Sequence, residues 1–126
     1  MNKAKAQSPT APRPFGYERM TLLPSDDVVD ALGVAHLSRA AFWRLVALGA
    51  DAVPAVKRGL EHPNPAVRRG CCEYLDLFWD EATASVVTAL LADPDPDVRW
   101  MAAHALSCDR CKNDTWAKRT RPGAPS

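Results

Sequence analysis

Four side chains in the second half of the chain are of types that bind transition metals. Cys108 and Cys111 form a C-D-R-C motif, and His104 precedes Cys108 by one helical turn, so the three share a face if a helix extends that far. Cys72 lies at nearly the same level as His104 but on the neighbouring predicted helix. The two side chains face each other only if the helices stack with one of the two possible hands. Three thiolates and an imidazole suit zinc. The sequence therefore offers a zinc site of Cys72, His104, Cys108 and Cys111 as one hypothesis, which would tie the end of the chain to its body.

The same cysteines are poor candidates for redox or nucleophilic catalysis. A redox dithiol gains reactivity at the N-terminal end of a helix, whereas the C-D-R-C motif is expected at a C-terminal end. Cys72 and His104 are the one candidate pair of nucleophile and base, and no third group or oxyanion hole accompanies them. The 6 glycines stand singly, so the sequence has no phosphate-binding loop. We expect no independent enzymatic activity and, zinc aside, no cofactor.

The part of the chain that must position these residues contains an internal sequence repeat. Residues 62–75 read HPNPAVRRGCCEYL, and residues 93–106 read DPDPDVRWMAAHAL. Self-similarity at a fixed period of this size is typical of stacked helical repeats. The shared residues are Pro63, Pro65, Val67, Arg68 and Leu75, which recur 31 positions later as Pro94, Pro96, Val98, Arg99 and Leu106.

Capping residues and prolines divide the middle of the chain into six predicted helices. Asn64 and Asp95 each precede a proline, which is the arrangement of an N-cap followed by proline at the first helical position. No segment alternates as a strand does. The sequence thus predicts an all-α fold, a short α-solenoid of about three antiparallel helix pairs. The helices are expected to begin at Ser25, Ser38, Asp51, Asn64, Asp80 and Asp95, and the last five to end near Gly49, Leu60, Phe78, Ala92 and Cys108.

The two ends of the chain lack apolar periodicity. Residues 1–20 are basic and rich in proline, which predicts a flexible arm, although Phe15 and Tyr17 could dock on the first helix. Residues 112–126 predict a disordered basic tail. The repeat domain is therefore expected to span residues 21–111.

The overall composition excludes several classes of protein. The formal net charge is +1, so there is no global attraction to nucleic acid or to a membrane surface. No apolar run approaches the ~18 residues that span a bilayer. The N-terminus lacks the apolar stretch of a secretory signal, so we expect a cytoplasmic protein whose 4 cysteines stay reduced.

The repeated pattern D-P-x-P-x-V-R-x-x-A-x-x-x-L resembles HEAT repeats, in the short bacterial form also seen in phycobilin-lyase-like proteins. The resemblance covers about residues 25–110. It implies that the first-turn arginine, here Arg68 and Arg99, bonds loop carbonyls or a loop carboxylate of a neighbouring repeat, with Asp95 and Asp97 as available partners. The metal-dependent hydroxylases among such proteins use His-Glu pairs, and no His-Glu dipeptide occurs here.

A helical wheel assigns one side of the second helix in each pair to the core. The resemblance to HEAT repeats implies that the opposite side lines a concave surface. Tryptophan and arginine on that surface are typical of protein-interface hot spots. The predicted core comprises Val53, Val56, Leu60, Val67, Cys71, Tyr74, Leu75 and Phe78 in the second pair, and Val86, Val87, Leu90, Leu91, Val98, Ala102, Ala105 and Leu106 in the third. The candidate partner-binding residues are Arg39, Trp43, Arg69, Glu73, Trp100 and His104, with Phe42, Val46, Cys72, Asp76, Ala103 and Ser107 on the same side.

These residues predict a non-enzymatic interaction module that binds a protein partner or another repeat protein, with self-association as an open variant. The alternative is the zinc-stabilised regulatory domain described above. Nucleic-acid binding ranks last, because acidic residues interrupt the basic clusters around Arg39, Arg44, Arg58 and Arg69.

Overall fold

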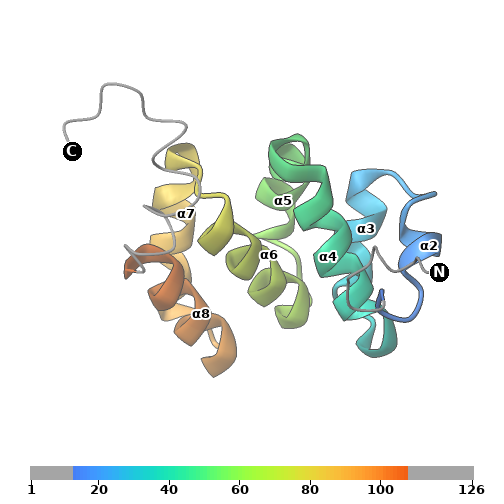
Figure 1. Cartoon of the computed structure of the whole chain (residues 1–126). Helices are drawn as coiled ribbons and strands as arrows, with labels where there is room; N and C mark the ends of the chain where they lie inside the picture. Colours follow the sequence, from blue (N-terminus) through green and yellow to red (C-terminus); the bar gives the residue numbers. More distant parts are fainter. Residues whose placement is uncertain (1–12, 108–126) are drawn as a thin grey trace, which may run out of the picture.

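The computed structural model describes residues 13–107, and every regular element in that range is helical. Figure 1 shows three antiparallel pairs following one another, α3 with α4, α5 with α6, and α7 with α8. The all-α solenoid that the sequence predicts is confirmed. The helices are α2 (Tyr17–Met20), α3 (Ser25–Ala31), α4 (Ser38–Leu48), α5 (Val53–Gly59), α6 (Pro65–Leu77), α7 (Ala84–Ala89) and α8 (Pro96–Ser107), with short 3₁₀ turns η1 (Ala35–Leu37), η2 (Gly49–Ala52), η3 (Glu81–Thr83) and η4 (Leu90–Ala92).

The second helices of the last two pairs begin where their capping residues predict. The Asn64 side chain accepts a hydrogen bond from the amide of Ala66 at 2.9 Å. Asp95 accepts from the amides of Asp97 at 2.8 Å and Val98 at 3.2 Å. These bonds satisfy amides that the first turn of a helix leaves without intrahelical partners.

The two predicted serine caps are wrong. Ser25 is the first residue of α3, and Pro24 in extended conformation precedes it as the cap residue. Ser38 opens α4, and its hydroxyl bonds back to the carbonyl of Ala35 at 3.4 Å. Because η1 leads into α4 without a break, Ser38 has no free first-turn amides to cap.

The first helices of the last two pairs are shorter than predicted. In place of one helix from Asp51 to Leu60, η2 leads into α5. In place of one helix from Asp80 to Ala92, α7 lies between the two 3₁₀ turns η3 and η4. Asp80 still accepts from the amide of Ala82, at 3.4 Å, so the predicted cap is present but begins a 3₁₀ turn.

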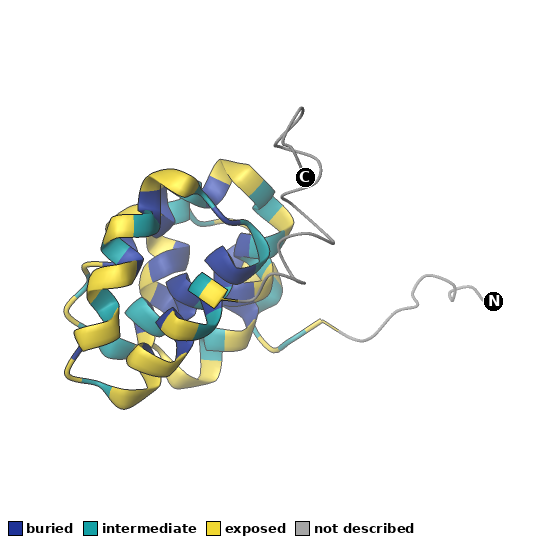
Figure 2. Ribbon diagram, turned by 90° about the vertical axis from the view of Figure 1, so that its left-hand side faces the viewer, coloured by how far each residue is buried: buried dark blue, intermediate teal, exposed yellow. Residues whose placement is uncertain are grey.

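The core lies between the two rows of helices. Figure 2 shows buried residues gathered on the inward sides of the helices and exposed residues on the outer sides. The predicted core is buried in the second pair, where Val67, Cys71, Tyr74 and Leu75 are inaccessible. In the third pair Leu91 is exposed, which corrects its assignment to the core. The further exceptions are Val53, Phe78, Val86, Leu90 and Leu106, which are half-buried.

Helices α3, α5 and α6 converge at Gly59, the last residue of α5. A Cβ atom at this position would lie 2.5 Å from the Cys71 sulfur and 2.6 Å from a methyl group of Val29. The absence of a side chain at Gly59 therefore lets α5 approach both neighbours. The most extensive contact between two described helices is that of α6 with α8, which joins the second pair to the third.

The two repeated arginines bond the loops as the resemblance implies, but through a different carboxylate. Arg68 donates to the carbonyls of His62 and Pro63 and forms a bidentate pair with Asp93, at 2.8 and 3.0 Å. Arg99 donates to the carbonyls of Asp93, at 2.8 Å, and Pro94, at 3.3 Å. Asp95 and Asp97 are not the partners: the Asp95 carboxylate caps α8, and no bond of Asp97 to either arginine is present. The Arg68 guanidinium lowers the pKa of Asp93.

Part of the predicted flexible arm is ordered against the repeats. Residues 17–20 form α2, which packs on α4 and buries Met20. Tyr17 packs against the core, whereas Phe15 is exposed with its ring 6.1 Å from that of His36. Residues 1–12 and the predicted tail lie outside the described residues. None of the described helices has the length and apolar character needed to cross a membrane.

Candidate interaction surface

Helices α4, α6 and α8 carry the predicted partner-binding residues. We call Arg39, Trp43, Arg69, Glu73, Trp100 and His104 the B-helix face. Its two tryptophans are both exposed: Trp43 is 42% exposed and Trp100 is 62% exposed. An exposed tryptophan leaves a large apolar area in contact with water, so two on one side of the molecule mark it as a candidate contact surface.

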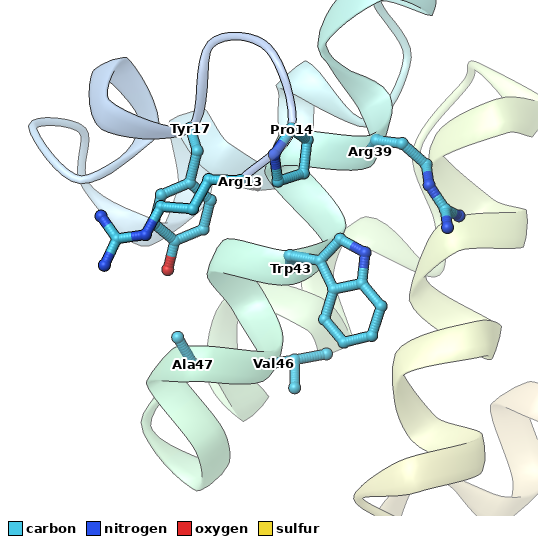
Figure 3. Close-up of a pocket in the computed structure, with 7 residues that line it drawn as sticks. All are labelled: Arg13, Pro14, Tyr17, Arg39, Trp43, Val46 and Ala47. Atoms are coloured by element: carbon cyan, nitrogen blue, oxygen red, sulfur yellow. The ribbon is translucent and has the colours of Figure 1, made fainter. Parts of the chain in front are cut away.

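An open groove of about 690 Å³ lies at the N-terminal end of this face. Figure 3 shows Trp43 and Val46 on successive turns of α4, and both side chains line the groove. The buried ring of Phe42 packs edge-on against the Trp43 indole, with the two ring centroids 5.4 Å apart. This contact supports the indole. The groove is lined by Arg13, Pro14, Tyr17, Arg39, Trp43, Val46 and Ala47.

Among residues 13–107, two arginines and no carboxylate line this groove. In Figure 3 the guanidinium groups of Arg13 and Arg39 point to opposite sides, with Tyr17 and Trp43 between them. The Arg13 guanidinium carbon lies over the Tyr17 ring, 5.0 Å from its centroid. Arg13 also forms an exposed pair at 3.4 Å with Glu18, which does not line the groove. Within residues 13–107, no hydrogen bond or ion pair engages Arg39.

Helices α4 and α6 leave a smaller hollow of about 160 Å³ beside the groove. Arg39 also lines this hollow, together with Arg69 and Glu73 of α6. Arg69 and Glu73 pair with each other at 3.0 Å, one helical turn apart. Their charges therefore largely cancel, and Arg39 remains the unpaired charge of this part of the face.

The C-terminal part of the face is built on an aromatic stack and a buried carboxylate. The rings of Trp100 and His104 lie parallel, with centroids 5.3 Å apart. His104 Nε2 is 3.3 Å from Asp76 Oδ2, which links α8 to α6. Asp76 Oδ1 is buried and has no hydrogen-bond partner within the described part of the chain. The stack holds the exposed indole in one orientation.

Three residues that the wheel places on this side are buried. Phe42, Cys72 and Asp76 are covered by neighbouring elements, which corrects their assignment to an exposed surface. A wheel gives the direction of a side chain but not the distance of the next helix, and α6 lies close to α8. Burial raises the pKa of Cys72 to about 12, with the carboxylate of Asp93 adding to the rise.

The described residues include half of the candidate zinc site. Cys72 is buried as a thiol, and His104 Nε2 lies 3.3 Å from the carboxylate of Asp76. Cys108 and Cys111 lie outside residues 13–107. Inside that range, no group of three or more His, Cys, Asp or Glu side chains is placed to hold a metal ion. The zinc hypothesis stays a prediction from the sequence.

The residues that line the groove from the N-terminal side are missing from the predicted set. The aromatic residues in the arm gave a partial signal, because from the sequence Phe15 and Tyr17 could dock on the first helix. That this docking creates a groove with α4 is a consequence of tertiary structure. Arg13 and Pro14 line it because they immediately precede the turn that leads into α2.

Paired antiparallel helices, a period of 31 residues and an arginine that joins successive loops define a helical-repeat protein of the solenoid class. The family of HEAT repeats matches residues 28–107, and the chain belongs to that family. No curated protein and no solved structure matches the chain.

Proposed function

We propose that this HEAT-repeat chain is a non-enzymatic interaction module that binds a protein partner, or another repeat protein, through its B-helix face. The observation that carries the proposal is the exposure of Trp43 and Trp100 on helices of the same row, at 42% and 62%. HEAT repeats commonly mediate protein interactions. We expect the cytoplasm as the compartment of this protein.

Both tryptophans are held in place before any partner arrives. Phe42 supports Trp43, and His104 stacks on Trp100. A side chain that is already ordered loses little conformational entropy on binding, so more of the contact energy appears as affinity. This is the property expected of anchor residues in an interface.

The chemistry of the described residues supports binding over catalysis. A nucleophilic cysteine needs a lowered pKa and an adjacent base, whereas burial raises the pKa of Cys72. Nucleic-acid binding has less support, because Arg58 pairs with Asp26 and Arg69 pairs with Glu73.

The test compares affinity capture by the wild-type chain with capture by Trp43→Ala and Trp100→Ala. We expect each substitution to weaken partner binding at least ~10-fold, a loss of about 1.4 kcal/mol. Leu22→Ala is the matched control, because Leu22 is an exposed apolar residue outside the B-helix face.

Circular dichroism of each variant separates loss of binding from loss of fold. If both tryptophan variants remain helical and retain their partners with unchanged affinity, the B-helix face is not the binding surface.

A further inference from the structure

We infer that the groove beside Trp43 binds an acidic peptide segment of another protein, which inserts one large apolar side chain between flanking carboxylates. This inference rests on the proposed interaction function and specifies the chemistry of the ligand.

The groove fits an apolar anchor. Trp43, Tyr17, Pro14, Val46 and Ala47 supply most of its lining. The groove is open to solvent, so a side chain can enter from an extended segment without displacing α2 or α4. A phenylalanine or leucine side chain fits on the Trp43 indole, where it is removed from water.

The arginines at the two sides of the groove favour acidic residues next to the apolar anchor of the ligand. Arg13 and Arg39 point away from each other, and no carboxylate from the described part of the chain lines the groove between them. Since Arg39 has no partner among residues 13–107, a ligand carboxylate gains a new ion pair there without breaking an existing one. Within the described residues, the one ion pair of Arg13 is with the exposed Glu18 at 3.4 Å, a contact that a second carboxylate can share. Acidic residues on both sides of the anchor therefore match the groove.

The ends of this chain are poor occupants by the same criterion. Residues 1–12 contain Lys3 and Lys5 and no acidic residue. Residues 108–126 contain five basic residues against Asp109 and Asp114. Both segments are net positive and would be repelled by the two arginines, so charge favours an occupant from a separate molecule.

The probe is a capped, fluorescently labelled peptide with a central phenylalanine flanked on each side by two aspartates. One control peptide carries asparagines in place of the aspartates, and a second carries alanine in place of phenylalanine. Binding to the full-length chain is measured by fluorescence anisotropy at low salt, and again at high salt, where exposed ion pairs are screened.

We expect the acidic peptide to bind at least ~10-fold more tightly than either control peptide. Trp43→Ala should weaken its binding at least ~10-fold, and Arg39→Gln should weaken it about 5-fold. Arg19→Gln is the matched control variant, because Arg19 is an exposed arginine of α2 that does not line the groove. It should leave the affinity unchanged.

Equal binding of the acidic and asparagine peptides, or an unchanged affinity in Arg39→Gln, would overturn the inference. If no peptide binds while Trp43→Ala still abolishes partner capture, the proposed function stands and the acidic ligand is wrong. If the chain is a dimer that Arg39→Glu dissociates, the groove holds a second copy, and a separate partner is wrong.

Discussion

Arg68 and Asp93 form the most buried ion pair among the described residues. Their side chains are 13% and 5% exposed, and both Asp93 oxygens accept from the guanidinium. The same arginine also satisfies two loop carbonyls. Because Asp93 stands in the loop before α8, this one side chain connects the second repeat to the third.

Removing the buried arginine should therefore cost much more than removing an exposed one. We expect Arg68→Ala to lower the free energy of unfolding by about 3 kcal/mol, since it leaves Asp93 buried without its counter-charge. Arg58 provides the matched control, because it forms a bidentate pair with Asp26 in which the side chains are 63% and 57% exposed. Arg58→Ala should cost less than about 1 kcal/mol. Urea denaturation measures both, and equal losses would contradict the role of Arg68.

At the scale of the helix, the position of α5 depends on the absence of a side chain at Gly59. Alanine at an ordinary position inside a helix is more favourable than glycine by about 0.5–1 kcal/mol. At Gly59 the added methyl group would meet the Cys71 sulfur and Val29 well inside contact distance. The contact with α3 and α6 therefore outweighs the helix propensity of this residue.

Gly59→Ala should thus destabilise the protein, by about 1–3 kcal/mol, although the substitution favours an isolated helix. Thermal denaturation followed by circular dichroism gives the sign directly. Cys71→Ala removes one of the two obstructing groups, so the double variant should lose less stability than the sum of the single variants. A gain in melting temperature for Gly59→Ala alone would show that α5 is not held at this distance.

The sequence predicted best those elements whose signals are local. Asn64 and Asp95 cap α6 and α8 because a cap needs only the next two or three residues. The first helices of the pairs were predicted less well, because their 3₁₀ ends adjust to the packing of the pair. Trp43 and Trp100, which the sequence predicts on an outer face, are exposed. Three further residues of that side proved buried, and the N-terminal wall of the groove was not predicted, since both depend on how separate elements meet.

For the whole molecule, the contacts between described helices are unevenly distributed along the stack. The third pair joins the second mainly through α6 and α8, whereas α7 has no extensive contact with α5. Helix α7 is also short, and Val87 is its one buried residue. In a repeat stack each unit depends on its neighbours, and the unit with fewest contacts opens most readily.

Amide hydrogen exchange should show this gradient. We expect the amides of residues 84–92 to exchange at least ~10-fold faster than those of α6 under native conditions, because a smaller opening exposes them. Exchange measured by mass spectrometry or NMR resolves the two segments. Uniform protection across α6 and α7 would mean that the described helices open as a single cooperative unit.

The adjacent thiols of Cys71 and Cys72 can report local opening of the helical stack. Neither is accessible in the closed fold, and burial raises the pKa of both thiols. Alkylating reagents attack the thiolate, so they can reach these two atoms only in the fraction of time during which α6 is separated from its neighbours. The rate of alkylation at Cys71 and Cys72 then measures how often the centre of the repeat array opens, and no probe has to be introduced.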